Sequence, residues 1–361
     1  MATLVNRSLS SPAPARSGNR ERANRRVAAW LLVCCALVFA IVVVGGVTRL
    51  THSGLSITEW QPIVGTLPPL SDADWNTAFA KYQLTPEYLQ VNKGMSLPGF
   101  QRIFWWEYFH RLLGRLVGVV FLLPFLWFMA RRQIPAGYAL RFAAIFALGA
   151  AQGALGWYMV KSGLTDDPRV SQFRLTAHLG LAFLIFAAML LCALSLLSPS
   201  RADRREVHPA MSSARRGSVA VACLVFLQVL SGALVAGTHA GLAYNMFPLM
   251  NGTLVPSEIL SLTPWWRNLF YNLATVQFDH RLLALLLAIA VPILWWRVVA
   301  VQDSQSRARV GAHLLLAMLC VQLALGIATL VFAVPLPLAA LHQAGALLLF
   351  GLALNLAHAL R

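Results

Sequence analysis

Eight long apolar runs constrain the fold of this chain more than any other feature of its sequence. They span roughly residues 27–47, 110–130, 138–160, 174–198, 216–238, 277–299, 310–333 and 336–358. An α-helix rises about 1.5 Å per residue, so about 20 apolar residues cross the roughly 30 Å hydrocarbon layer of a membrane. A soluble helical core would instead need helices with one polar face. We therefore expect an all-α polytopic membrane protein with eight transmembrane helices.

The basic residues lie mostly between these runs and indicate how the chain crosses the membrane. The net charge of +16 would suggest nucleic-acid binding in a soluble protein. Here the long connections 48–106 and 240–276 balance acidic and basic residues, and they alternate with arginine-rich segments at 1–26, 131–141, 201–216 and 297–309. Basic loops stay on the cytoplasmic side. We expect cytoplasmic termini, a bacterial inner (plasma) membrane rather than the mitochondrial inner membrane, and no nucleic-acid partner.

The chain also repeats itself, with four segments that match in the same order. "GGVTRLTHSGL" (45–55) resembles "SGALVAGTHAGL" (231–242), and "HRLLGRLVGVV" (110–120) resembles "HRLLALLLAIA" (280–290). Two further matches relate 151–164 to 321–336 and 174–186 to 338–350. An even number of spans gives both copies the same orientation. We predict two tandem, pseudo-symmetric four-helix bundles at 27–200 and 217–361, with a basic cytoplasmic tail at 1–26 and a cytoplasmic linker at 201–216.

Four histidines recur at equivalent places in the two copies. His110 and His178 belong to the first copy, and His280 and His342 to the second. A single intramembrane histidine can serve as a hydrogen bond between helices, but two matched pairs favour a functional site in each bundle. Two imidazoles that face each other across a bundle can hold a haem iron from both sides. Zinc would need a third or fourth ligand, so the pairs favour haem.

A glutamate distinguishes the two copies. Glu107 lies three residues before His110, on the same helix face, whereas the equivalent residue before His280 is Gln277. A carboxylate beside a haem can move protons or stabilise positive charge that develops on a porphyrin substituent. The alternative is an interfacial glutamate that pairs with Arg111 or Arg102. The asymmetry predicts that one bundle performs chemistry and the other only holds a redox centre.

Charged residues also flank the paired histidines. Arg111 and Arg281 directly follow His110 and His280 at the outer membrane boundary. A guanidinium there can bind a haem propionate bidentately, or it can simply extend to the membrane surface. Asp279 can orient a ligand or cap the start of its helix.

Four stretches closely resemble the haem A synthase family: "GGVTRLTHSGLSITEWQPIVGTLPP" (45–69), "EYFHRLLGRL" (107–116), "TAHLGLAF" (176–183) and "FDHRLLA" (278–284). The resemblance covers about residues 27–358. It implies an oxidoreductase that converts haem O to haem A for cytochrome oxidase, oxidising a porphyrin methyl group to a formyl group by successive hydroxylations. Since the connections 48–106 and 240–276 contain no cysteine, the chain resembles the branch of the family without loop cysteine pairs.

The resemblance also implies residue roles and partners. It assigns a permanent haem b to the C-terminal histidine pair, the substrate haem iron to the N-terminal pair, and catalysis to the glutamate. The residues concerned are His280 and His342 with Arg281, His110 and His178 with Arg111, and Glu107. The implied partners are haem O, membrane lipid, a haem O synthase, oxidase-assembly proteins, an electron-transfer partner or quinone, and a second copy of this chain.

Two other functions fit part of the same pattern. A bis-histidine membrane cytochrome that only passes electrons predicts equivalent bundles, which the contrast between Glu107 and Gln277 disfavours. A parallel-repeat transporter that relays protons through its histidines predicts no tightly bound chromophore.

Overall fold

Eight long helices account for most of the described chain. The computed structural model describes residues 14–59, 64–164, 168, 170–198, 209–301 and 306–361. The long helices are α1 (Pro14–Leu50), α4 (Leu97–Ala130), α5 (Ala139–Gly163), α6 (Gln172–Leu197), α7 (Pro209–Thr238), α9 (Leu273–Val299), α10 (Ser306–Val331) and α11 (Leu336–Ala359). Within the described ranges, all eight are long and apolar enough to cross a membrane. The prediction of an all-α protein with eight transmembrane helices is confirmed.

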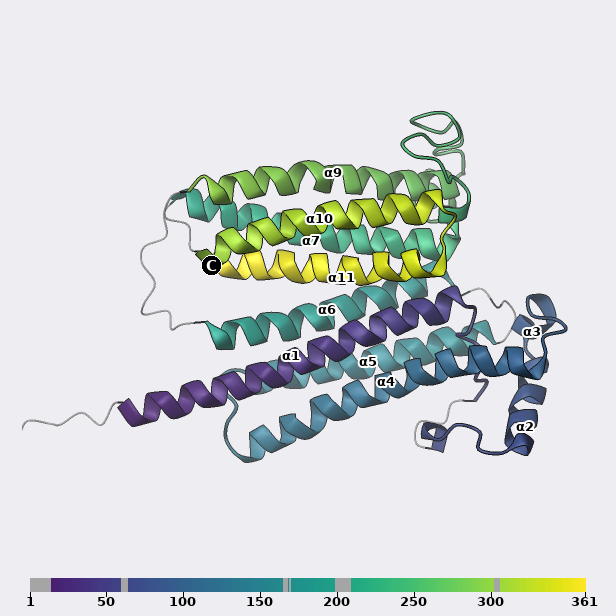
Figure 1. The fold of residues 1–361 in the computed structure, drawn as a ribbon, viewed down its shortest axis with the longest axis horizontal. Helices are drawn as coiled ribbons and strands as arrows, with labels where there is room; N and C mark the ends of the chain where they lie inside the picture. Colours follow the sequence, from purple (N-terminus) through teal and green to yellow (C-terminus); the bar gives the residue numbers. More distant parts are fainter. Residues whose placement is uncertain (1–13, 60–63, 165–167, 169, 199–208, 302–305) are drawn as a thin grey trace, which may run out of the picture.

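We divide the long helices by chain order into two groups of four (Figure 1). The N-terminal group contains α1, α4, α5 and α6, and the C-terminal group contains α7, α9, α10 and α11. The groups meet where α6 packs against α7 and where α1 and α6 pack against α11. Buried apolar side chains, among them Leu31, Phe183, Leu347 and Leu356, fill the core. In lipid, such close packing holds helices together in place of the exclusion of water.

The start of α1 and the C-terminus lie at the same end of the molecule (Figure 1). The short helices α2 (Asp72–Gln83) and α3 (Pro86–Gln90), and the connection that leads into α9, lie at the opposite end. We call the latter the outer end, after the predicted orientation. A chain that crosses the membrane an even number of times has both of its termini on the same side.

Five of the long helices, α1, α4, α7, α9 and α10, begin at least four residues before the predicted spans. α1 begins at Pro14, so residues 14–26 of the predicted tail are helical, while residues 1–13 lie outside the described part of the chain. α4 begins at Leu97 because Ser96 accepts a hydrogen bond from the Gly99 amide. α9 begins at Leu273, after an Asn272 cap. The histidines predicted to open their helices therefore lie well inside them. The predicted linker 201–216 overlaps α7, which begins at Pro209, and residues 199–208 lie outside the described ranges.

The first long connection folds into a small aromatic cap on the outer turns of α4. Tyr82 of α2 stacks on Phe100 with ring centroids 5.2 Å apart, and its hydroxyl accepts a hydrogen bond from Asn92 at 2.7 Å. Tyr108 donates a hydrogen bond to the Thr66 carbonyl at 2.7 Å. These contacts fix the cap directly above the segment of α4 that carries the predicted catalytic residues.

Glu87 makes the stability of this cap depend on pH. It is 5% exposed, and burial, with a smaller contribution from the negative charge of Glu107, raises its pKa from 4.5 to about 8. The folded cap keeps a proton that the unfolded segment loses, so the cap should lose stability as the pH rises from 4.5 to about 8. The protection of residues 72–90 against hydrogen exchange in detergent, corrected for the intrinsic pH dependence of exchange, should fall over that range in the wild type but not in Glu87→Gln. Equal pH dependence in both proteins would show that Glu87 is not responsible.

Candidate functional site: paired histidines inside the membrane

Each of the four paired histidines packs against a glycine on the neighbouring helix. In the N-terminal group, a Cβ added at Gly45 of α1 would lie 2.7 Å from His110 Cε1, and one at Gly156 of α5 would lie 3.1 Å from His178 Cε1. Both distances are shorter than an ordinary contact, so a side chain at either glycine would force the imidazole to shift. His110 and His178 are close enough to interact electrostatically.

The C-terminal group repeats this arrangement. A Cβ at Gly232 of α7 would lie 3.1 Å from His280 Cε1, and one at Gly326 of α10 would lie 2.9 Å from His342 Cε1. His280 and His342 also interact electrostatically. The structure thus brings together both pairs that the sequence predicts. In the described part of the chain, no three or more His, Cys, Asp or Glu side chains cluster as metal ligands.

Glutamines beside three of these histidines were not predicted from the sequence. Gln322 donates to the His342 carbonyl at 2.9 Å, and its Nε2 lies 3.1 Å from His342 Nδ1. Gln228 donates to the His280 carbonyl at 3.1 Å, and its Nε2 lies 3.2 Å from both ring nitrogens, Nδ1 and Nε2. Gln152 donates only to the His178 carbonyl, at 3.0 Å. In each case the glutamine precedes the facing glycine by four residues, a spacing that was visible in the sequence.

Glu107 is buried and accepts four hydrogen bonds. Its side chain is 2% exposed. Oε2 accepts from the Ser56 hydroxyl at 2.7 Å and the Ile57 amide at 2.8 Å, and Oε1 accepts from Arg111 at 2.6 and 3.0 Å. The ion pair with Arg111 was one of the predicted alternatives, and Arg102 is not the partner. A buried carboxylate so fully bonded is held in one orientation.

The equivalent position in the C-terminal group is equally buried beside an arginine, but it is uncharged and more loosely hydrogen-bonded. Gln277 is also 2% exposed; it donates to the Tyr244 carbonyl at 3.3 Å and accepts from Arg281 at 3.4 Å. Both positions thus hold a buried polar side chain that contacts the arginine four residues later. The two groups differ here in chemistry rather than in fold.

Arg111 of α4 and Arg281 of α9 each bind backbone carbonyls of an outer connection and hold that connection against the helix. Arg111 donates to the carbonyls of Ile57 and Glu59 at 2.9 and 3.1 Å. Arg281 donates to four carbonyls of the second connection, those of Tyr244, Met246, Pro248 and Leu249. Its Nε is buried and has no partner among the described residues, so one donor remains for an anionic ligand. The predicted contact with haem propionates stays a prediction.

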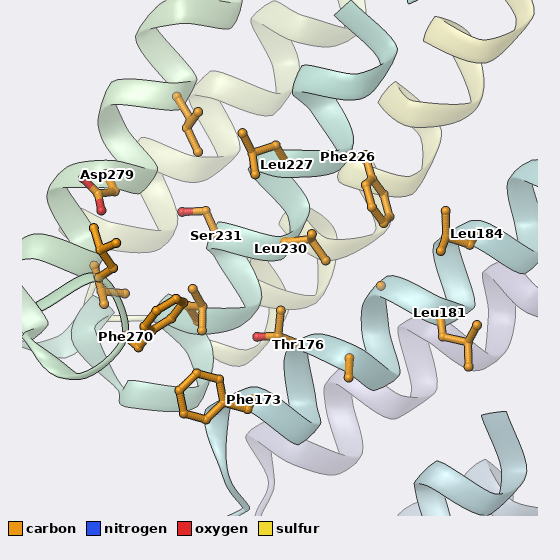
Figure 2. Close-up of a pocket in the computed structure, with 16 residues that line it drawn as sticks. Phe173, Thr176, Leu181, Leu184, Phe226, Leu227, Leu230, Ser231, Phe270 and Asp279 are labelled. Carbon is orange, nitrogen blue, oxygen red and sulfur yellow. The ribbon is translucent and has the colours of Figure 1, made fainter. Parts of the chain in front are cut away.

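A cavity of about 620 Å³ lies between the two helix groups (Figure 2). Apolar side chains of α6, α7 and α9 form most of its wall, and none of the four paired histidines lines it. Its polar groups come from Thr176, Ser231 and Asp279. Asp279 is not a helix cap, because Asn272 caps α9 and Asp279 lies in the second turn.

Comparison with known proteins agrees with the geometry. The family model described as cytochrome oxidase assembly protein, COX15-CtaA, matches residues 28–354. A protein from Nitrosospira multiformis named heme A synthase is 57% identical over 97% of this chain and 98% of its own length. Proteins of the same name from Nitrosomonas eutropha and Paramagnetospirillum magneticum are 56% and 49% identical, over 91% and 95% of this chain and 92% and 96% of their own lengths. The chain belongs to the haem A synthase family.

Membership in the haem A synthase family confirms the resemblance inferred from the sequence. The alternatives of an electron-transfer cytochrome and of a transporter are not favoured by these relatives. The assignment of each histidine pair to a particular haem stays a prediction.

Proposed function

We propose that this member of the haem A synthase family oxidises a methyl substituent of haem O to a formyl group within its N-terminal helix group. The observation that carries this proposal is the buried Glu107, placed one helical turn outward from His110 in a group that also contains His178. His110 and His178 would hold the iron of the substrate haem. The C-terminal group has the same histidine pair but Gln277 instead of a carboxylate, which fits a haem that stays unchanged.

The C-terminal residues fit a resident haem b. Iron bound to histidine Nε2 leaves a proton on Nδ1, and that proton needs an acceptor. Gln228 and Gln322 each have a buried Oε1 without a partner among the described residues, on the same amides whose Nε2 lies 3.1–3.2 Å from the Nδ1 atoms. His280 and His342 would be the axial ligands, with Arg281 Nε available to a propionate. Such a haem would supply one-electron redox chemistry.

Glu107 is suited to move protons at the substrate substituent. Conversion of a methyl group to a formyl group, written with water as the source of the oxygen, releases four electrons and four protons, and the electron-transfer partner or quinone would accept the electrons. In the last step, a geminal diol loses water to give the aldehyde. Glu107 would take the proton from one hydroxyl and return it to the departing hydroxyl, so that this step needs no net proton. Arg111 and Ser56 would hold the carboxylate in place.

We also propose which membrane contains this protein and which partners it meets there. Arginine-rich connections and the common end of α1 and the C-terminus support cytoplasmic termini in a bacterial inner membrane. Haem O is hydrophobic and would arrive from the lipid phase or from the enzyme that makes it. We expect a haem O synthase, oxidase-assembly proteins and an electron-transfer partner or quinone to meet this protein there.

Production of haem A tests the proposed function directly. The full chain should be produced together with a haem O synthase in a host that makes no haem A, and the membrane haems should be extracted and separated. We expect haem A, together with haem b bound to the purified protein. Haem b alone would support a cytochrome that only passes electrons, and purified protein without haem would refute both functions.

The close contact of each imidazole with a glycine gives a second test of the haem b site. Gly326→Ala places a methyl group 2.9 Å from His342 Cε1 and should displace the ligand, so we expect roughly tenfold weaker haem b retention. Gly311→Ala is the matched control on α10, because its nearest atom would lie at 3.6 Å. Haem b content measured on purified protein should fall only in Gly326→Ala. Full retention there would contradict the predicted ligand.

A further inference from the structure

The cavity between α6, α7 and α9 has no role in the proposed haem sites, and its rim faces the lipid. Among the apolar side chains that line it, Phe173, Leu184 and Leu227 are 41–48% exposed. Exposed apolar surface on a membrane-spanning helix is in contact with lipid. A hydrophobic molecule dissolved in the membrane can therefore reach the cavity of about 620 Å³ from the side.

Two polar residues of the cavity wall are chain neighbours of the residues that form the His280 site. Asp279 directly precedes His280 on α9. Ser231 directly precedes Gly232 on α7, the glycine that packs against the His280 ring. A molecule in the cavity would therefore lie beside the helical turns that carry the proposed haem b ligand.

These two polar residues have no partners of their own. Ser231 is 9% exposed. Among the described residues, neither its hydroxyl nor the Asp279 carboxylate makes a hydrogen bond or an ion pair, whereas the Thr176 hydroxyl donates to the Gln172 carbonyl at 2.8 Å. Figure 2 shows the Ser231 hydroxyl pointing toward the side of the cavity where Asp279 lies. Because an unpaired polar group in apolar surroundings is costly, the pair favours a ligand that carries a polar oxygen.

A membrane quinone matches both the apolar wall and the two polar groups. A carbonyl of the quinone ring can accept a hydrogen bond from the Ser231 hydroxyl, and after reduction the hydroxyl at that ring position can donate to the Asp279 carboxylate. The isoprenoid tail suits the apolar wall, and the cavity volume lies within the range of about 300–1,000 Å³ that is usual for small-molecule sites. A lipid acyl chain would fill the same space but leave both polar groups unpaired.

We propose that this cavity binds the membrane quinone that accepts the electrons of the proposed oxidation, with Ser231 and Asp279 holding one of its ring oxygens. Written with water as the source of the oxygen, oxidation of one methyl group to a formyl group releases four electrons and four protons. Two quinones take up two electrons and two protons each and become two quinols, so electrons and protons balance. The inference rests on the proposed function, because its electrons come from the haem O methyl group.

Photo-cross-linking tests the site without measuring activity. The purified full chain in lipid nanodiscs should be irradiated with a low concentration of an azido-substituted ubiquinone, and the labelled peptides should be identified by mass spectrometry. We expect label within residues 173–184, 226–234 and 276–283, and unlabelled decylubiquinone should displace it. Ser231→Ala removes one hydrogen bond, so the decylubiquinone concentration that halves the labelling should rise roughly two- to tenfold.

A control and a second variant keep this test decisive. Ser218→Ala is the matched control, because it removes a buried hydroxyl from the same helix that bonds to the Arg215 carbonyl at 2.8 Å and does not line the cavity; it should behave like the wild type. Ala177→Phe places a ring in the cavity and should abolish the displaceable label even if Ser231→Ala cannot be purified. Label outside the three segments, unchanged labelling in Ala177→Phe, or equal displacement by oleic acid would overturn the inference, and the last result would identify a lipid site.

Electron acceptance is tested separately on the same protein. Without oxygen, decylubiquinone should oxidise the reduced haem b of the wild type, each quinone taking two electrons from two protein molecules and two protons from water. The half-saturating quinone concentration should rise in Ser231→Ala by the same factor as in the labelling. Haem b that stays reduced would overturn the role as electron acceptor. Protein that binds quinone in the cavity but makes no haem A would instead overturn the proposed function.

Discussion

Replacing Glu107 with glutamine should stop the formation of haem A while both histidine pairs continue to bind haem. The substitution keeps the size of the side chain and can keep the bonds from Ser56 and Ile57, but it removes the carboxylate that receives a proton. General acid–base groups typically contribute about 10²–10⁴-fold to rate, so we expect haem A production to fall by at least about a hundredfold. Haem O or a hydroxylated intermediate should accumulate on the purified protein.

The second helix group supplies a control for this experiment. Gln277→Glu introduces a carboxylate at the equivalent buried position, beside Arg281, and should leave haem A production in place because that group is not expected to alter its haem. Extracted haems should be separated for both variants and the wild type. Haem A produced by Glu107→Gln at the wild-type level would show that Glu107 is not catalytic.

Replacing His280 with alanine should remove the spectrum of the resident haem b. His280 and His342 are close enough to interact electrostatically, and a haem that loses one of two axial ligands loses the low-spin, six-coordinate state. We expect haem b content to fall at least tenfold in the purified protein, in line with the loss caused by removing ligand support. The reduced-minus-oxidised absorption spectrum measures the change, and His342→Ala should give the same result.

Two checks separate loss of a ligand from loss of the fold. The His280→Ala protein should insert and purify as a folded protein, since the side chain contributes to a site and not to the packed core. His313→Ala is the control, because His313 lies on α10 and accepts a hydrogen bond from Trp295 at 2.9 Å, away from the pairs. An unchanged haem b spectrum in His280→Ala would place the resident haem elsewhere.

The repeat explains why so much of the site could be predicted from the sequence. His110 and His280, and His178 and His342, stand in matching segments, and apolar helices leave few other polar residues to consider. The contrast between Glu107 and Gln277 was visible for the same reason. The structure gives both residues equally buried positions at 2% exposure, so the difference between them is one of charge.

The helix starts and the loop contacts could not be predicted in the same way. Hydropathy places the starts of α4 and α9 near residues 110 and 277, but Ser96 and Asn272 cap these helices earlier, where aromatic and polar residues pack under the outer connections. The carbonyls that Arg281 binds belong to a connection whose path depends on tertiary structure. Side-chain patterns carry little information about such backbone acceptors.

The glutamines beside the histidines could not be assigned to the site from the sequence, for a different reason. The spacing Gln-x-x-x-Gly occurs at 152–156, 228–232 and 322–326, yet a lone polar residue in an apolar helix has many alternative roles. Only the packing of each imidazole against the glycine reveals that Gln228 and Gln322 belong to the histidine sites.

The division of labour between the two helix groups is the central claim, and the haems bound to two paired variants test it most directly. One variant carries His110→Ala and His178→Ala, and the other carries His280→Ala and His342→Ala. Each should be purified from membranes that contain haem O, and its extracted haems should be quantified. The first should retain haem b and contain neither haem O nor haem A, whereas the second should lack haem b and still contain haem O. Loss of haem b from the first variant, or of haem O from the second with its haem b retained, would contradict the assignment.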